Sequence, residues 1–318
     1  MPERPLIAVA RWIPDEAVKV LSDAGEVRMS GLDRPLTPDE LRSFVAGSSA
    51  IVSMLHDRID DAVAEAAGPE LAVVANVAVG YDNVDVAALA ARGVTVTNTP
   101  GVLTDATADL AFGLLLALTR RLGEGERLLR AREPWSFHLG FLLGSGLRDK
   151  TLGIVGPGQI GRAMAERAAA FGLRVVYSGR SEKPGFPAEF VSFGELLCRA
   201  DFVSLHCPLT PETHHLIDAE ALRAMKPGAY LVNTTRGPVV DEAALADALE
   251  AGEIAGAALD VFEHEPAVEP RLLTRDDVVV TPHLGSATVE TRTAMAVLAA
   301  RNVTSVLAGG APLTEVAP

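Results

Sequence analysis

The sequence predicts an α/β protein built from two doubly wound parallel-sheet domains. Short apolar runs alternate with alanine-rich helical segments along most of the chain, which is the pattern of repeated βα units. Pro100-Gly101 interrupts this alternation, and a second alternating series begins at Thr151. The chain has 318 residues, of which 48% are hydrophobic. This length can supply two separate hydrophobic cores.

The two series locate the domains. Strands are expected in the first at 6–10, 50–55, 71–77 and 94–98, and in the second at 151–156, 174–178, 202–206, 229–233, 255–261 and 277–281. One long helix is expected at about 105–130 and a last one at about 288–308, with no strand after it. The boundaries therefore lie near residues 100 and 285.

The composition excludes several classes of protein. A formal net charge of −14 argues against nucleic-acid binding, which needs clustered positive charge. Cys198 and Cys207 are too few for a disulfide framework, and no zinc-binding spacing occurs, so no metal is expected. The His214-His215 pair is interpreted as part of a solvated loop. The apolar run at the start is too short for a signal peptide, and the segment 111–119 is too short to span a membrane. We therefore expect a cytoplasmic protein.

The segment Gly-Pro-Gly-Gln-Ile-Gly joins a β-branched strand to an alanine-rich helix. Gly156, Gly158 and Gly161 would let the backbone turn tightly and approach a pyrophosphate, which the amino end of the helix attracts. Any residue is expected to be tolerated at the position of Pro157. A GxGxxG motif alone is weak evidence, but the strand before it and the helix after it favour dinucleotide binding over an ordinary turn.

Three polar residues follow expected strands of the second series. They are Arg236, Glu265 and His283, and each alone has an ordinary structural explanation. Together they suit the reduction of a 2-oxo acid. A guanidinium can bind a carboxylate bidentately, an imidazolium can donate a proton as hydride arrives, and a carboxylate beside the imidazolium favours its protonated form.

The segments NTTRGPVVD, LDVFEHEP and TPHLGSAT resemble the signature segments of the D-isomer-specific 2-hydroxyacid dehydrogenases. VGYDNVD at 79–85 is a further specific marker, and GVLTDATAD and YSGR resemble the glyoxylate/hydroxypyruvate reductase branch. The resemblance covers about 50–310. It implies a flavodoxin-like substrate domain (1–100 plus 286–318), with the last helix packed back on it, a Rossmann NAD(P)-binding domain (101–285), and a cleft between them.

The resemblance also implies roles for single residues. Arg236 would bind and polarise the substrate, and His283 would be the acid/base paired to Glu265. The substrate would further be bound by the backbone N–H groups of Val79 and Gly80 and by Leu55, Ser286 and Trp135. The residues implied for the cofactor are Thr107, Gly156, Gly158, Gln159, Ile160, Gly161, Ser178, Arg180, Lys183, Cys207, Pro208, Thr213, Thr234, Arg236, Asp260, His283 and Gly285. In this branch Trp135 reaches the neighbouring subunit of a homodimer, but the segment after it departs from the usual W-x-P.

The stretch VVYSGRSEKP lacks the acidic residue that binds the adenosine ribose in NAD-specific proteins. Counting from Gly156, that acid would fall at Gly179. Glycine there is expected to open space for a 2′-phosphate, with a hydroxyl from Ser178 and cations from Arg180 and Lys183. The sequence therefore predicts an enzyme that prefers NADPH, with NAD possible, and reduces a small 2-oxo acid such as glyoxylate or hydroxypyruvate.

Two alternatives stay open. One is another D-2-hydroxyacid dehydrogenase, in particular a phosphoglycerate dehydrogenase, although the carboxylate loop lacks the cations that a phosphorylated substrate would need. The other is a dinucleotide-sensing corepressor, which would share the fold and the catalytic residues but turn over negligibly. The chain offers no basic face for such a partner.

Overall fold

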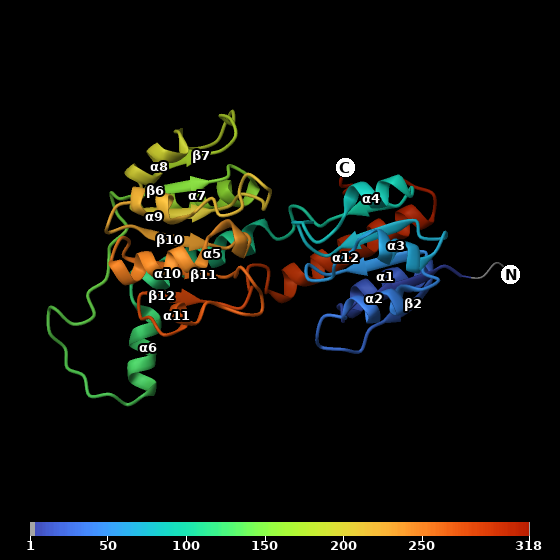
Figure 1. Cartoon of the computed structure of the whole chain (residues 1–318), viewed down its shortest axis with the longest axis horizontal. Helices are drawn as coiled ribbons and strands as arrows, with labels where there is room; N and C mark the ends of the chain where they lie inside the picture. Colours follow the sequence, from blue (N-terminus) through green and yellow to red (C-terminus); the bar gives the residue numbers. More distant parts are fainter. Residues whose placement is uncertain (1–3, 318) are drawn as a thin grey trace. The chain divides into compact units, whose positions relative to one another are not determined.

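The computed structural model describes residues 4–317, which divide into two compact units (Figure 1). The first unit includes the chain up to Leu103 and again from Ser286 onward. The second extends from Thr104 to Gly285.

The first unit is built on a parallel sheet with the strand order β2-β1-β3-β4-β5. Its strands are β1 (Leu6–Val9), β2 (Glu26–Met29), β3 (Ala50–Ser53), β4 (Val73–Asn76) and β5 (Thr95–Thr97). This order is that of the flavodoxin-like doubly wound fold, which the sequence predicted. The edge strand β2 is mostly exposed, so it carries no hydrophobic pattern by which the sequence could reveal it.

Helices cover both faces of this sheet. They are α1 (Asp15–Ala24), α2 (Pro38–Val45), α3 (Asp61–Ala67), α4 (Val86–Ala91) and α12 (Val289–Leu307). Helices α1 and α12 pack with Ile7, Val9 and Val52, while α2, α3 and α4 pack with Ala8 and Ile51 on the opposite face. Strands buried on both faces must be apolar throughout, which explains the uninterrupted apolar runs of the sequence.

The second unit holds a longer parallel sheet with the order β12-β11-β10-β9-β6-β7-β8. Its strands are β6 (Thr151–Val155), β7 (Arg174–Ser178), β8 (Glu189–Phe190), β9 (Phe202–Leu205), β10 (Tyr230–Asn233), β11 (Gly256–Leu259) and β12 (Val278–Val280). Counted from β6, the order begins 3-2-1-4-5-6, which is that of the Rossmann fold, and one more parallel strand follows. The strand order changes direction between β6 and β9.

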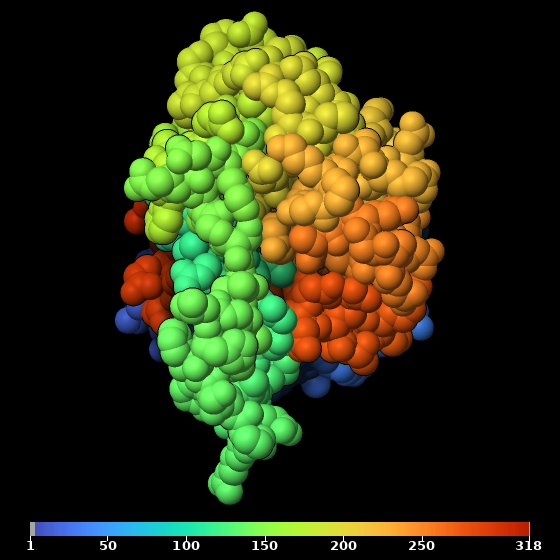
Figure 2. Space-filling view, turned by 90° about the vertical axis from the view of Figure 1, so that its left-hand side faces the viewer, coloured from blue at the N-terminus to red at the C-terminus, as the bar shows by residue number. Residues whose placement is uncertain are grey.

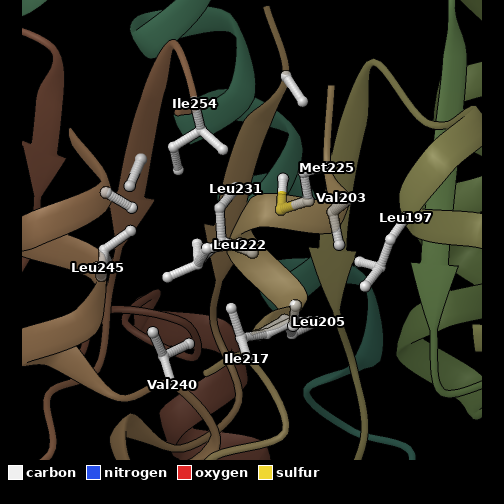
Figure 3. Close-up of a cluster of buried hydrophobic side chains, with 14 of the residues drawn as sticks. Leu197, Val203, Leu205, Ile217, Leu222, Met225, Leu231, Val240, Leu245 and Ile254 are labelled. Atoms are coloured by element: carbon white, nitrogen blue, oxygen red, sulfur yellow. The ribbon is translucent and has the colours of Figure 1, made fainter. Parts of the chain in front are cut away.

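Helices also cover both faces of the longer sheet. The helices of this unit are α5 (Thr104–Thr119), α6 (Leu122–Arg130), α7 (Gln159–Ala170), α8 (Phe193–Arg199), α9 (Ala219–Ala224), α10 (Glu242–Ala251), α11 (Pro270–Leu273) and the 3₁₀ turn η1 (Gly237–Val239), and all but α6 have buried residues. Leu197, Leu222 and Leu245 from α8, α9 and α10 pack with Val203 and Leu231 of the sheet (Figure 3). Helices α5 and α7 pack on the other face.

The single helix expected at about 105–130 is in fact two helices, α5 and α6. The backbone N–H of Ser145 donates to the carbonyl oxygen of Thr119 at 2.8 Å, and the hydroxyl of Thr119 donates to Leu115 O at 2.8 Å. Arg121 then adopts a left-handed φ of 52°. The helix ends because a distant segment takes the carbonyl that the next turn would have used.

Helix α6 and the loop after it stand out from the layered body of this unit (Figures 1 and 2). No residue of α6 is buried. The loop exposes Trp135, Phe137, Leu139 and Leu143, of which Phe137 is 82% and Leu139 is 89% exposed. A concentration of large apolar side chains at a monomer's surface is typical of a contact with another molecule.

Candidate active site

The loop between β6 and α7 has the geometry of a pyrophosphate-binding loop. Gly156 has a φ of 102°, and a Cβ there would lie 2.6 Å from backbone atoms of His206 and Cys207. A Cβ at Gly161 would lie 2.3 Å from the carbonyl oxygen of Gly156, whereas no atom lies within 4 Å of the same place at Gly158. The first and third glycines therefore permit close packing, and the second leaves the amino end of α7 open to an anion, as a dinucleotide requires. Gln159 is exposed and Ile160 half-buried in the first turn of α7.

Asp260, just after β11, holds the loop that carries His283. Its buried carboxylate, 1% exposed, accepts hydrogen bonds from Leu284 N at 2.7 Å, Gly285 N at 2.8 Å and the Thr281 hydroxyl at 2.7 Å. Burial raises the pKa of Asp260, although these hydrogen bonds oppose the shift. The sequence assigned Asp260 only to the cofactor, and the structure adds that it organises the backbone beside His283.

Thr107 and Gly285 lie next to Asp260. A Cβ at Gly285 would lie 3.4 Å from the Asp260 carboxylate and 3.4 Å from the Thr107 methyl group. Thr107 itself is 5% exposed on α5. Three residues that the sequence assigned to the cofactor from distant segments are thus brought together at the carboxyl end of β11.

The end of β9 forms the wall beside the phosphate loop. Cys207 is buried, and burial raises the pKa of its thiol to about 11. Burial also lowers the pKa of His206 to about 4, and its Nε2 lies 2.9 Å from the Ser204 hydroxyl. Both side chains are therefore uncharged at neutral pH, so this wall adds no charge beside a bound phosphate.

Three other residues assigned to the cofactor, Pro208, Thr213 and Thr234, differ in exposure and in hydrogen bonding. Pro208 is exposed. The Thr213 hydroxyl donates to Pro208 O at 2.6 Å and accepts from Thr210 N at 2.8 Å, so it closes its own loop. In contrast, the buried hydroxyl of Thr234 has no hydrogen-bond partner among residues 4–317.

The stretch after β7 corrects one expectation about Gly179. Ser178 is buried and ends β7, whereas Gly179, Arg180 and Lys183 are exposed. The space beside Gly179 is not open on every side, because a Cβ there would lie 2.7 Å from Cδ and 3.1 Å from Cγ of Pro157. The identity of residue 157, expected to be unimportant, therefore matters to what position 179 can hold.

Arg180 also has an acidic neighbour that the sequence did not reveal. A hydrogen bond involving Thr210 is the main cause that lowers the pKa of Glu212, and the charge of Arg180 contributes to the same shift. Glu212 therefore lies close enough to Arg180 to act on its guanidinium electrostatically.

His283 and Glu265, predicted to act as a pair, are in contact. His283 Nδ1 lies 3.0 Å from Glu265 Oε2, and Glu265 Oε1 accepts a hydrogen bond from Phe262 N at 3.0 Å. His283 has a left-handed φ of 54°, and its N–H donates to Asp260 O at 2.8 Å. The carboxylate thus orients the imidazole through its contact with Nδ1.

Arg236 lies between β10 and η1, next to the segment that follows β11. Its Nη1 donates to Thr235 O at 2.9 Å, and its carbonyl oxygen accepts from Asn233 Nδ2 at 3.0 Å. A Cβ at Gly237 would lie 1.8 Å from the carbonyl carbon of Phe262. Only glycine permits this contact, which brings the loop of Arg236 against the loop of Glu265.

In the first unit, two asparagines orient the backbone of Val79 and Gly80. Asn98 Nδ2 donates to Val79 O at 2.9 Å, and Asn76 Nδ2 donates to Gly80 O at 3.0 Å. The N–H of Gly80 belongs to the same planar trans peptide as Val79 O and therefore points the opposite way. The N–H of Val79 likewise points away from Ala78 O, which accepts from Thr99 N at 2.8 Å.

The loop that follows β3 and carries Leu55 is hydrogen-bonded to the loop that carries Val79 and Gly80. Asn83 Nδ2 donates to Met54 O at 3.0 Å, and Met54 N donates to the buried Asp57 carboxylate at 2.7 Å. Burial raises the pKa of Asp57. Sequence reasoning missed these asparagines and Asp57, although a polar residue that ends an apolar strand, as Asn76 does, is a usable signal.

The histidine pair is not simply a solvated loop. His214 is exposed, but His215 is half-buried and its Nε2 lies 2.7 Å from Glu263 Oε1. His215 also has a left-handed φ of 50°. The predicted absence of a metal stays a prediction.

Comparisons with known proteins agree with this geometry. Residues 112–285 match the model of the D-isomer specific 2-hydroxyacid dehydrogenase, NAD binding domain. The chain is 45% identical over 317 residues to the glyoxylate reductase of Thermococcus litoralis, covering 97% of this chain and 96% of that one. The chain belongs to the D-isomer-specific 2-hydroxyacid dehydrogenase family.

Solved structures also resemble this chain over nearly its full length. The crystal structure of a Thermus thermophilus protein matches with a TM-score of 0.93 at 46% identity and covers 98% of this chain and 100% of that one. The NADPH-dependent glyoxylate/hydroxypyruvate reductase of Sinorhizobium meliloti, in complex with NADP and malonate, matches with a TM-score of 0.87 at 37% identity, covering 99% and 97% of the two chains.

As a member of this family, the protein is an NAD(P)-dependent oxidoreductase with a Rossmann cofactor-binding domain. Within residues 4–317, no helix is long and apolar enough to cross a membrane.

Proposed function

We propose that this protein reduces a small 2-oxo acid, glyoxylate or hydroxypyruvate, to the 2-hydroxy acid with a preference for NADPH. The observation that carries the proposal is the His283–Glu265 pair at 3.0 Å, placed after β12 and β11 of the cofactor-binding unit. The substrate domain is formed by 1–100 with 286–318 and the cofactor domain by 101–285. A relative that is 45% identical to this chain bears the name glyoxylate reductase.

His283 supplies the proton in this reaction. A bound nicotinamide supplies the hydride to the carbonyl carbon of the substrate. Because Glu265 accepts from Nδ1, the proton that His283 gives to the carbonyl oxygen leaves from Nε2. In the oxidation direction the same nitrogen accepts the proton of the 2-hydroxyl group. Glu265 holds the ring in place and balances the charge that it gains.

Arg236 and the first unit hold the substrate. The guanidinium of Arg236 binds the carboxylate in a fork and polarises the neighbouring carbonyl group. The N–H groups of Val79 and Gly80 add donors to the carboxylate, supported by the bond from Asn98 to Val79 O, which orients the Gly80 N–H, and by the bond from Thr99 N to Ala78 O, which orients the Val79 N–H. Leu55, with Met54 and Phe141, suits a small uncharged substituent. Ser286 is proposed as a further polar contact.

The proposed preference for NADPH depends on the end of β7 and on the exposed residues that follow it. Arg180 and Lys183 offer cations to a 2′-phosphate and Ser178 offers a hydroxyl, while Gly179 places no carboxylate there. The remaining residues proposed to bind the cofactor include those of the phosphate loop and of the His283 loop. They are Thr107, Gly156, Gly158, Gln159, Ile160, Gly161, Cys207, Pro208, Thr213, Thr234, Asp260 and Gly285, with Arg236 and His283.

We further propose a homodimer in which the loop carrying Trp135 contacts the second subunit. Trp135 is 56% exposed and stacks on Phe141 with ring centroids 6.0 Å apart. Next to it, Phe137 and Leu139 are the most exposed large apolar side chains of this loop. The cytoplasmic location stays a prediction.

Steady-state kinetics test the proposed reaction. We expect glyoxylate and hydroxypyruvate to be reduced with NADPH, with kcat/KM at least about ten-fold higher than with NADH, because one charge-assisted contact to the 2′-phosphate has this effect. Pyruvate and a phosphorylated 2-oxo acid serve as comparison substrates. Faster turnover of the phosphorylated acid would indicate a phosphoglycerate-type enzyme, and negligible turnover of all four would indicate a cofactor sensor.

The contribution of Arg180 can be measured separately. We expect Arg180→Ala to raise KM for NADPH about ten- to hundred-fold, the equivalent of one charged hydrogen bond, and to change KM for NADH by less than about two-fold. The matched control is Arg199→Ala, which removes a guanidinium of the same unit that pairs with Glu189 and Glu195. An unchanged KM for NADPH in the Arg180 variant would mean that this arginine is only a solvated surface charge.

A further inference from the structure

Pro157 and Gly179 are in a contact that leaves no room for a side chain at position 179. A Cβ at Gly179 would lie 2.7 Å from Cδ and 3.1 Å from Cγ of the proline ring, and the next atom, Ser181 O, is 3.9 Å away. Carbon atoms at van der Waals contact are about 3.5–4.0 Å apart. The proline ring is thus the single obstacle to a side chain at this position.

The proline cannot easily move aside. Its Cδ is bonded to its own backbone nitrogen, so displacing the ring displaces the phosphate loop. That loop is anchored directly before Pro157, at Gly156. Gly156 N donates to Ser178 O at 2.9 Å, and Gly156 is packed against the backbone of His206 and Cys207 with no space for a Cβ. The Gly156–Ser178 bond also ties the end of β7 to the loop, so Gly179 cannot withdraw from the ring.

Position 179 is where an acidic residue would bind the adenosine ribose of NAD, as counted from the phosphate loop. We propose that Pro157 is a specificity-determining residue, because its ring excludes an acidic side chain at position 179 and so keeps the site suited to NADP(H). This inference rests on the proposed preference for NADPH. It assigns the cofactor preference to two positions, Pro157 in the phosphate loop and Gly179 after β7. Both act in addition to the cations Arg180 and Lys183.

A pair of stability measurements tests the contact without any cofactor. Gly179→Ala in the natural sequence is expected to lower the Tm of the cofactor-free protein by roughly 2–8 °C, the usual result of overpacking. In a protein that also carries Pro157→Ala, which removes both Cδ and Cγ, adding Gly179→Ala is expected to change Tm by less than about 2 °C. The control is Gly194→Ala in α8, where no atom lies within 4 Å of the new methyl group.

Kinetics with both cofactors test the role in specificity. Gly179→Asp alone is expected to lower kcat/KM about ten-fold or more with NADPH and with NADH, because the carboxylate displaces the phosphate loop that both cofactors share. Gly179→Asp combined with Pro157→Ala is expected to raise the ratio of kcat/KM for NADH over NADPH at least about hundred-fold relative to the natural protein, since the acid can then bind a 2′-hydroxyl and repel a 2′-phosphate.

The Tm measurements and the cofactor kinetics distinguish the ways in which the proposal could be wrong. An equal loss of Tm on Gly179→Ala with and without Pro157→Ala would overturn the steric contact. If the contact is found but Gly179→Asp alone already switches the cofactor, Pro157 does not determine specificity. A natural protein that uses NADH better than NADPH would overturn both the proposed preference and the specificity role, while the Tm comparison would still decide whether the ring excludes a side chain.

Discussion

The His283→Asn variant is expected to reduce glyoxylate with a kcat about 10²- to 10⁴-fold lower than the natural protein, the usual loss when a general acid is removed. Asparagine is chosen because His283 has a φ of 54°, and asparagine tolerates this left-handed conformation better than alanine does. The substitution therefore removes the proton donor and leaves the backbone conformation undisturbed. Stopped-flow or steady-state rates of NADPH oxidation measure the loss.

His215→Asn is the matched control for this experiment. His215 also has a left-handed φ, of 50°, and also pairs with a glutamate, at 2.7 Å. It lies outside the residues proposed to contact substrate or cofactor, so kcat should stay within about two-fold of the natural value. Binding of NADPH, followed by fluorescence, should change only a few-fold in the His283 variant. A His283 variant that keeps its turnover would disprove the proposed proton donor.

The Arg236→Gln variant is expected to lower kcat/KM for glyoxylate about 10²- to 10³-fold. Glutamine keeps one polar group but removes the charge and the fork that binds a carboxylate with two charged hydrogen bonds, each contributing about 1.5–3 kcal/mol. Arg236→Lys should recover only part of the loss, because an ammonium group offers the charge without the planar geometry. The loss should appear mainly in kcat/KM for the 2-oxo acid rather than in kcat/KM for NADPH.

Arg275→Gln serves as its control. Arg275 precedes β12, at the amino end of the strand, and forms an ion pair with Asp277 at 2.7 Å. Its loss removes one arginine of the same unit without touching the carboxyl ends of the strands, so kcat/KM should stay within about two-fold. If Arg236→Gln and Arg275→Gln had equal, small effects, the substrate carboxylate would have to be bound elsewhere.

Much of the architecture was readable from the chain. Apart from the exposed edge strands β2 and β8, the strands of both sheets are mostly apolar because they are buried on two faces, and the helices between them repeat at regular intervals. The phosphate loop was recognisable because its glycines lie between such a strand and such a helix. His283 and Glu265 were predictable as neighbours because the carboxyl ends of parallel strands share one edge of the sheet.

The sequence misled where a contact between distant residues overrides a local pattern. The stretch from 105 to 130 is helical by pattern, but Ser145 takes the carbonyl of Thr119 and ends α5. His215 was expected in solvent because nothing near it in the chain suggests its partner Glu263. Neither contact leaves a periodic signal in the sequence.

The sequence by itself thus determined the fold class, the family and the pairing of His283 with Glu265, because these depend on hydrophobic periodicity and on short motifs. Only the tertiary structure decided that Asp260 holds the His283 loop and that Asn76 and Asn98 bind the carbonyl groups of Gly80 and Val79. It also decided that Pro157 fills the place of a side chain at Gly179. These features depend on distances of a few ångströms between segments far apart in the chain, which residue type and spacing alone do not specify.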